Sequence, residues 1–162
     1  MQSDGVIERY AIGGAVGATF YLEPVATLDV DVFVELHAEP GSAIVSLKHI
    51  FKYLRDRGCK MEGEYVVIAD WPVQFLPAGA PLLQEALATA VEKDMEGTPV
   101  RVLTPEHVVA VALETGRAKD RARVLQFIEA GAVDLDRLKE ILRRHDLIGR
   151  WEQFERQFSE QG

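Results

Sequence analysis

Two carboxylates separated by one residue, Asp29 and Asp31, are the first candidates for chemistry in this chain. They lie in a segment, 28–36, whose alternating pattern has a period of two and therefore predicts a β-strand. Successive side chains of a strand point to opposite faces, so the two carboxylates share one face, about 6–7 Å apart. Both can then lean toward one divalent cation, and Mg²⁺ or Mn²⁺ prefers such oxygen ligands. Phe33 shares that face, which predicts that another element covers it.

A pair of glycines, Gly13-Gly14, precedes this strand and opens a segment, 15–21, that is predicted to be helical. Glycine lets the backbone turn sharply, and N–H groups at the positive end of a helix can bind a phosphate. A phosphate-binding turn and a metal-binding carboxylate pair together make half of a phosphoryl-transfer site. The alternative is a glycine-rich turn followed by a strand face that is simply solvated.

In this order and context, the two motifs resemble the nucleotidyltransferase superfamily of DNA polymerase beta, especially its minimal and abortive-infection toxin (AbiEii-type) branches. The signature of that superfamily is a Gly-Gly or Gly-Ser turn, a helix, and an Asp-x-Asp or Asp-x-Glu strand. The resemblance implies a Mg²⁺-dependent protein that uses a nucleoside triphosphate (NTP), with Asp29 and Asp31 as catalytic and metal-binding residues. It also implies that Gly13, Gly14 and Thr27 contact the nucleotide.

The superfamily uses a third acidic residue on a neighbouring strand, and the resemblance places Gln74 at that catalytic position. An amide oxygen can ligate a cation weakly, but it is uncharged and accepts no proton at neutral pH. A prokaryotic branch of the superfamily has a similar Val-Gln-Phe-Leu-Pro strand and a similar Thr-Gly-Arg-x-Lys-Asp loop. Asp70 and Glu64 are the candidate substitutes for the third acid, although Asp70 lies in a segment typical of a turn.

A basic loop, 115–120, carries Arg117 and Lys119 between two predicted helices. By the same resemblance, a Lys-Asp pair at this place borders the nucleotide site, so Arg117 and Lys119 are candidate phosphate contacts. The alternative is that these basic residues interact with the C-terminus of the first helix while Asp120 caps the second.

The composition limits the classes of function. The 162 residues suit one compact domain, and 48% apolar residues are enough for a packed core. No apolar run approaches the roughly 20 residues of a membrane helix, and the polar N-terminus lacks signal-peptide features. Cys59 is the only cysteine, which predicts a reducing cytoplasm. The net charge of −8 argues against a non-specific nucleic-acid surface but allows a single nucleotide. The four histidines show no metal-ligand spacing and are predicted to be packing or surface residues.

The remaining patterns predict an α/β fold, in which a small mixed sheet of the nucleotidyltransferase type is backed by helices. We expect that core over 1–103 and a helical C-terminal part over 104–162, packed on it as one compact domain. The expected strands are 10–12, 28–36, 65–69, 73–76 and 100–103. In the first part, the expected helices are 15–21, one that begins at a Ser42 cap after a turn at 39–41 and ends at Gly58, and one whose apolar face is Leu83, Leu87, Ala90 and Val91. In the second part, they run from Thr104 to Gly116, over 120–130 and from Asp134, and a last short helix lies around Trp151.

Two functions of different classes follow. The first is a nucleotidyltransferase that passes nucleoside monophosphate (NMP) from an NTP to an unknown acceptor (a protein, an RNA or a small molecule), with weak activity because Gln74 replaces an acid. The second is an inactive protein of the same fold that binds a nucleotide or a partner, such as a toxin–antitoxin-like component. A structural protein without a ligand would require Asp29 and Asp31 to be merely solvated.

Overall fold

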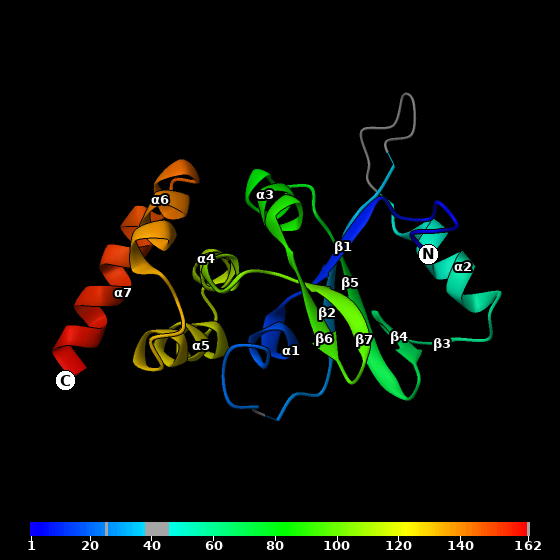
Figure 1. Cartoon of the computed structure of the whole chain (residues 1–162), viewed down its shortest axis with the longest axis horizontal. Coiled ribbons are helices and arrows are strands. Elements are labelled where there is room, and N and C mark those ends of the chain that lie inside the picture. Colours follow the sequence, from blue (N-terminus) through cyan, green and yellow to red (C-terminus); the bar gives the residue numbers. More distant parts are fainter. Residues whose placement is uncertain (25, 38–45, 162) are drawn as a thin grey trace.

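A mixed β-sheet forms the centre of the computed structural model, which describes residues 1–24, 26–37 and 46–161 (Figure 1). Within those residues seven strands pair in the order β3-β4-β5-β2-β1-β7-β6. The β2·β5 and β1·β7 pairs are parallel and the other pairs are antiparallel. The strands are β1 (Arg9–Ile12), β2 (Val30–Glu35), β3 (Lys60–Glu62), β4 (Tyr65–Ile68), β5 (Trp71–Pro77), β6 (Val91–Met95) and β7 (Thr98–Val102). The predicted α/β class with a mixed sheet is confirmed.

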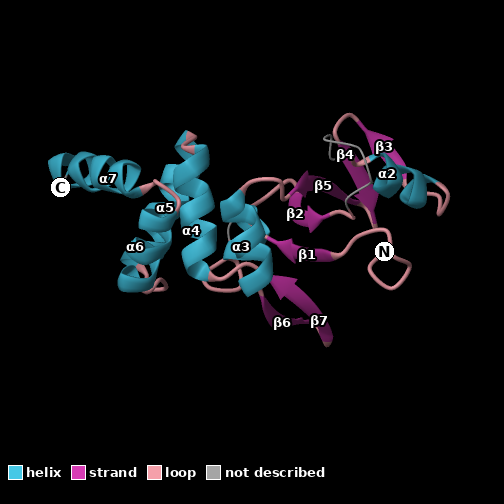
Figure 2. Ribbon diagram, turned by 90° about the horizontal axis from the view of Figure 1, so that it is seen from above, coloured by secondary structure: helices cyan, strands magenta, loops and turns pink. Residues whose placement is uncertain are grey.

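Helices cover both faces of this sheet, and the C-terminal helices extend the molecule beyond one side of it. They are α1 (Gly14–Ala18), α2 (Lys48–Arg55), α3 (Pro81–Thr89), α4 (Pro105–Thr115), α5 (Ala118–Glu129), α6 (Leu135–Arg144) and α7 (Ile148–Gln161). Figure 2 shows α4 to α7 gathered on one side, whereas α2 lies at the opposite end beside β3 and β4. Within the part of the chain that the structure describes, no helix combines the length and apolar character needed to cross a membrane.

The alternation of β2 divides the apolar core into two clusters. Val34 faces α2 and packs in one cluster with Ile50 and Phe75. Phe33, on the opposite face, belongs to the larger cluster that α3 to α7 build. Phe33 is only 6% exposed, which confirms that other elements cover its face. Because Asp31 shares this face, the strand directs it toward the C-terminal helices.

Two predicted boundaries are wrong at the segments that flank the site, and a third prediction there is untested. The helix after the glycines ends at Ala18 instead of residue 21. The strand begins at Val30, and Leu28 is 89% exposed instead of lying on the buried face. The predicted turn at 39–41 and the Ser42 cap lie outside the described residues.

The hairpin β6–β7 replaces the end of a predicted helix. Helix α3 ends at Thr89, and Val91, which was assigned to its apolar face, begins β6 and pairs with Val102. Glu96 and Gly97 make the turn, both with positive φ. Their two-residue loop is the sequence signal that was overlooked. Strand β3 was also missed, because three residues are too few to show a period.

Asp70 is a turn residue, as predicted. The turn between β4 and β5 consists of Ala69 and Asp70, both with φ in the left-handed region, whereas Trp71 and Pro72 already belong to β5. Two positive φ values in a two-residue loop match the twist of the paired strands. Aspartate tolerates this conformation better than most residues. Asp70 therefore serves the hairpin and lies outside the site described below.

Thr104 begins the C-terminal half of the chain as the sequence predicted. Its side chain accepts a hydrogen bond from the backbone of His107, Pro105 occupies the first helical position, and Gly116 ends α4 with φ +69°. A hydroxyl cap, an early proline and a left-handed glycine are the ordinary signals of helix ends. Helix α5 begins at Ala118, two residues before the predicted start.

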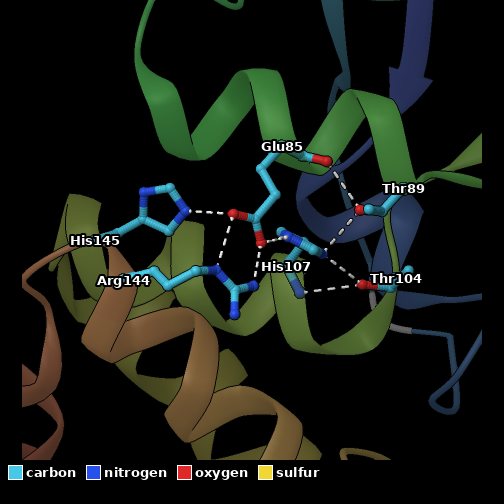
Figure 3. Close-up of polar contacts among 6 residues, drawn as sticks. All are labelled: Glu85, Thr89, Thr104, His107, Arg144 and His145. Atoms are coloured by element: carbon cyan, nitrogen blue, oxygen red, sulfur yellow. Dashed lines mark hydrogen bonds and ion pairs between the residues drawn. The ribbon is translucent and has the colours of Figure 1, made fainter.

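A polar cluster around Glu85 joins three of these helices (Figure 3). Glu85 of α3 contacts His107 of α4 at 3.1 Å, His145 at the end of α6 at 2.7 Å, and Arg144 of α6 at 2.7 Å. The hydroxyl of Thr104 lies 2.8 Å from Nδ1 of His107. The cluster therefore joins α3, α4 and α6 by directional polar contacts, which add specificity to the apolar packing between these helices.

The partners of His107 define its protonation state. The imidazole is buried, with 3% exposure, and burial lowers its pKa. The neutral ring donates from Nε2 to Glu85 and accepts at Nδ1 from Thr104, so both nitrogens are satisfied. The hydrogen bond from Arg144, supported by those from both histidines, lowers the pKa of Glu85 to about 2.

Both shifts predict that acid destabilises the fold. Glu85 titrates at about 2 in the folded chain against an ordinary 4.5, so its contribution is complete above about 4.5 and is lost as the pH falls toward 2. The lowered pKa of His107 adds a loss that begins below its ordinary 6.5. Replacement Glu85→Gln should lower the free energy of unfolding at pH 7 by about 2 kcal/mol.

Urea unfolding followed at several pH values tests this prediction. The difference between wild type and Glu85→Gln should narrow as the pH falls below about 4.5, because protonation removes the same charge. The control is Glu92→Gln on the exposed strand β6, which should change little. A difference that stays constant down to the acid limit would contradict the assigned role of Glu85.

Candidate functional site

The candidate site is built on one row of residues across the sheet. The parallel register of β2 and β5 pairs Asp31 with Gln74. Continuing the antiparallel register of β4 and β5 by one residue from Val66↔Val73 brings Tyr65 opposite Gln74. Directly paired residues point to the same face of a sheet. Asp31, Gln74 and Tyr65 therefore share the face that looks toward α4 and α5.

This row forms the floor of a cavity of about 480 Å³. The volume lies within the range of small-molecule sites. The walls come from α1, β2, the β3–β4 hairpin, α4 and α5. The polar residues that line the cavity are Asp29, Asp31, Glu64, Tyr65, Gln74, Glu114, Thr115, Arg117, Lys119, Asp120 and Arg123. Two predicted carboxylates, the predicted glutamine and both predicted basic residues thus share one cavity, while their roles remain predictions.

The glycine turn lies directly against Asp31. Gly14 has φ +59°, and a Cβ at this position would overlap Oδ2 of Asp31. The N–H of Gly13 donates to the carbonyl oxygen of Asp31 at 3.0 Å. A Cβ on Gly13 would lie 2.5 Å from the ring of Phe33. Both glycines are therefore required by space, and Gly14 also by conformation. Gly14 lines the cavity, whereas Gly13 packs beneath it.

The surroundings of Asp31 disfavour the ionised form of its side chain. Burial raises its pKa, and the neighbouring Asp29 carboxylate raises it further. Lys119, Arg123 and Arg117 act in the opposite direction, and in that order. An acid raised by burial and by a like charge is a common feature of functional sites.

A buried carboxylate organises the basic wall opposite. Asp120 is 1% exposed, and its carboxylate accepts hydrogen bonds from Nε of Arg117 at 2.7 Å and from Nη1 of Arg123 at 3.3 Å. Its oxygen also accepts the backbone N–H of Arg117, as expected for a residue that caps α5. The hydrogen bond to Asp120 raises the pKa of Arg117. Both alternatives for this loop therefore hold in part: Asp120 caps the helix, and the basic side chains face the cavity.

Arg123 was not among the predicted site residues, although it lies three residues after Asp120 on the same helix face. The basic residues of the loop were alternatively expected to interact with the C-terminus of α4, but another residue makes that interaction. Arg150 of α7 donates to the carbonyl oxygens of Leu113 and Glu114 at 3.2 and 2.6 Å. No local pattern relates Arg150 to α4, so only the folded chain reveals this contact.

Besides Gly13, two predicted residues, Thr27 and Asp70, are not part of the cavity lining. Thr27, predicted to contact a nucleotide, donates its hydroxyl to the carbonyl oxygen of Asp29 and so supports the start of β2. Asp70 belongs to the β4–β5 turn. Among the suggested substitutes for the third acid, Glu64 alone lines the cavity.

Tyr65 lines the cavity together with two acids, Asp29 and Glu64. Desolvation, followed by the charges of these two acids, raises the pKa of Tyr65. In the described ranges 1–24, 26–37 and 46–161, no three or more His, Cys, Asp or Glu side chains form a group that could hold a metal. Any cation here would thus rely on two carboxylates and neutral oxygens.

Comparison with solved structures identifies the fold. The chain is similar to an antigenic nucleotidyltransferase-like protein from Paracoccidioides brasiliensis, with a TM-score of 0.53 and 14% identity over 75% of this chain and 66% of that one, just under two thirds. It is also similar to the antibiotic-resistance factor ANT(2'')-Ia, with a TM-score of 0.51 and 16% identity over 98% and 91% of the two chains. No protein-family model and no curated protein sequence matches the chain.

At these identities the likeness concerns the fold alone. The chain has a nucleotidyltransferase-type fold, and this confirms the expectation drawn from the Gly-Gly and Asp-x-Asp motifs. The more specific resemblance to AbiEii-type proteins remains a prediction. The site residues must be judged by their own geometry.

The contact between Gly14 and Asp31 leads to a prediction about stability. Gly14→Ala should lower the free energy of unfolding by about 1–3 kcal/mol from backbone strain, with a further loss from overlap with the carboxylate. Gly58→Ala is the matched control, because Gly58 has φ +83° and no atom near its Cβ position. Denaturant unfolding should show a larger loss for Gly14→Ala than for Gly58→Ala.

A double-mutant cycle isolates the overlap. In the double variant Gly14→Ala with Asp31→Ala, the shorter side chain removes the two closest atoms, Oδ2 and Cγ, and leaves only Cβ at 3.1 Å, so the combined loss should be smaller than the sum of the single losses. Additive losses would show that Gly14 and Asp31 do not touch.

Proposed function

We propose that this chain binds an NTP together with Mg²⁺ in the cavity between Asp31 and Arg117 and passes NMP to an acceptor. The observation that supports this most is the arrangement around Asp31: Gly14 lies against it, Gln74 pairs with it, and a basic wall faces it. The acceptor must offer a nucleophilic group, which can belong to a protein, an RNA or a small molecule.

The donor atoms fit Mg²⁺ or Mn²⁺. Asp29, Asp31 and the amide of Gln74 present oxygen atoms only, which are the ligands that hard cations prefer. The raised pKa of Asp31 points the same way, because a cation would relieve the repulsion between the two carboxylates. Asp29 and Asp31 would hold the ion, and it would supply positive charge against the phosphate oxygens.

Arg117, Lys119 and Arg123 support a place for the phosphates on α5. All three line the cavity, and a guanidinium can make paired hydrogen bonds with phosphate oxygens. Asp120 keeps Arg117 and Arg123 oriented before any ligand arrives. This preparation reduces the cost of ordering long side chains on binding. The triphosphate would therefore extend from Gly14 toward α5.

Gln74 limits the rate that this site can reach. The amide beside Asp31 carries no charge and takes no proton, so the row lacks the acid that the superfamily uses there. A positioned general base contributes about 10²–10⁴-fold to a rate. We therefore propose weak transfer. The second candidate, a binding module without transfer activity, is favoured by this same replacement.

Transfer is tested with NTPs labelled at the α-phosphate. The purified protein, Mg²⁺ and a cell extract as the source of acceptors are incubated together, with extract alone as the background. Label that appears on a macromolecule or small molecule only with the protein supports transfer and reveals the acceptor. Binding without transferred label supports the second candidate, a toxin–antitoxin-like or other binding component.

Binding of an NTP with Mg²⁺ should raise the melting temperature. At a ligand concentration about 100 times Kd, binding adds about 2.7 kcal/mol to the free energy of unfolding, which raises the melting temperature by roughly 5–10 °C for a chain of this size. Asp31→Asn should abolish the rise, since it removes the negative charge that attracts the ion, while the unliganded fold persists. Thermal unfolding with and without nucleotide provides the measurement.

Asp70→Asn is the matched control for that experiment. It makes the same chemical change in the β4–β5 turn, outside the cavity, where asparagine also tolerates positive φ. It should retain the full nucleotide effect. A normal rise in Asp31→Asn would place the nucleotide elsewhere on the protein.

Restoring an acid at position 74 should strengthen the site. Gln74→Asp adds a carboxylate beside Asp31, so a lower Mg²⁺ concentration should suffice for the nucleotide-dependent rise in melting temperature. Without an ion, the added charge should lower the stability of the protein through repulsion. A Mg²⁺ titration of both proteins by thermal unfolding checks this, and an unchanged midpoint would mean that Gln74 lies outside the ion's reach.

A further inference from the structure

The proposed transfer needs a proton acceptor, and Gln74 cannot supply it. Most acids in the cavity already have another task. Asp29 and Asp31 would hold the ion, and Asp120 is paired with Arg117 and Arg123. The side chains that remain are Glu64 and Glu114.

The direction of transfer distinguishes these two glutamates. In phosphoryl transfer, the attacking and leaving oxygens lie roughly in line on opposite sides of the phosphorus. The basic wall of α5 would receive the leaving pyrophosphate, so the acceptor must approach from the other side. Glu114 belongs to the last turn of α4, close to that basic wall. The β3–β4 hairpin lies on the opposite side of β2 from α5 in both views (Figures 1 and 2).

Glu64 projects from the tip of that hairpin. Strands β3 and β4 pair through Glu62 and Tyr65, so Gly63 and Glu64 form a two-residue turn, with Gly63 at φ +62°. This turn holds Glu64 next to Tyr65, and both side chains line the cavity. Continuing the β4–β5 register by one residue places Tyr65 opposite Gln74. Glu64 is thus one residue along the chain from the row that contains the position of the missing acid.

Glu64 is also accessible. It is exposed and lines the mouth of the cavity, where an acceptor would enter. Among the described residues, no ion pair of Glu64 with a basic side chain is present. A carboxylate without a cationic partner keeps its capacity to accept a hydrogen bond from an incoming hydroxyl group.

We infer that Glu64 is the catalytic base of this site, acting on a hydroxyl acceptor from the β3–β4 side. The inference rests on the proposed transfer function. In the step, the acceptor's O–H gives its proton to a Glu64 oxygen, and the acceptor oxygen bonds to the α-phosphorus. The bond from that phosphorus to the bridging oxygen breaks, and its electron pair leaves with pyrophosphate.

The test compares Glu64→Gln with Glu62→Gln, a control on the same hairpin that lies outside the cavity lining. Each protein is incubated with the four NTPs labelled at the α-phosphate, Mg²⁺ and cell extract, and transferred label is measured. Glu64→Gln should reduce transfer by about 10²–10⁴-fold, whereas Glu62→Gln should retain the wild-type rate. The nucleotide-induced rise in melting temperature should persist in both variants, because neither removes a phosphate or metal contact.

A rescue variant separates the loss of a base from damage to the site. Adding Gln74→Asp to Glu64→Gln places a carboxylate beside Asp31, at the position of the missing acid, and should recover transfer. Equal rates in wild type and Glu64→Gln would overturn the inference. So would a wild-type protein that binds NTP but transfers no label, although nucleotide binding would then stand. Absence of any nucleotide-dependent rise in melting temperature would instead remove the proposed function and the inference together.

Discussion

The close approach of the Gly14 backbone to the Asp31 carboxylate is the constraint on which the site depends. It requires a glycine in the left-handed region, and it requires β1 and β2 to be in register so that Gly13 can donate to the Asp31 carbonyl. The same β2 alternation places Phe33 under the helices and Val34 over α2. One strand thus connects the carboxylate to both halves of the core, and a slip by one residue would turn every side chain to the wrong face.

The cavity combines opposite charges that are kept apart by the fold. Asp29 and Asp31 repel each other on the sheet side, while Asp120 holds Arg117 and Arg123 on the helix side. Burying like charges costs free energy, and the sheet can tolerate this cost only because α4 to α7 form a large apolar core. Binding sites commonly retain such local conflicts, since a ligand of the right charge resolves them.

The sequence alone predicts the parts of this structure that local patterns encode. The period-two strand, the diglycine turn and the Thr104 cap all follow from short-range rules, and so does the placement of Gln74 once the family resemblance orders the strands. The ion pairs of Asp120 with Arg117 and Arg123 are local, but only the fold shows that this side of α5 lines the same cavity as Asp31. Strand β6 was missed since Val91 fits a helical spacing as well as a strand start. The role of Thr27 is ambiguous in the sequence for a related reason: a hydroxyl near a motif can bind the backbone, as Thr27 does here, as well as a ligand.

The separation between sheet and helices also determines what each half of the chain contributes. Residues from β2, β5 and the β3–β4 hairpin provide oxygen atoms, and residues from α5 provide cations. The Glu85 cluster joins α3, α4 and α6 by ion pairs, and α5 follows α4 directly in the chain. A phosphate chain that spans the cavity would therefore join two surfaces of opposite charge. Apolar side chains, among them Phe33, Leu83 and Val108, line the rest of the cavity, so a ligand that fits it would combine charged groups with an apolar part.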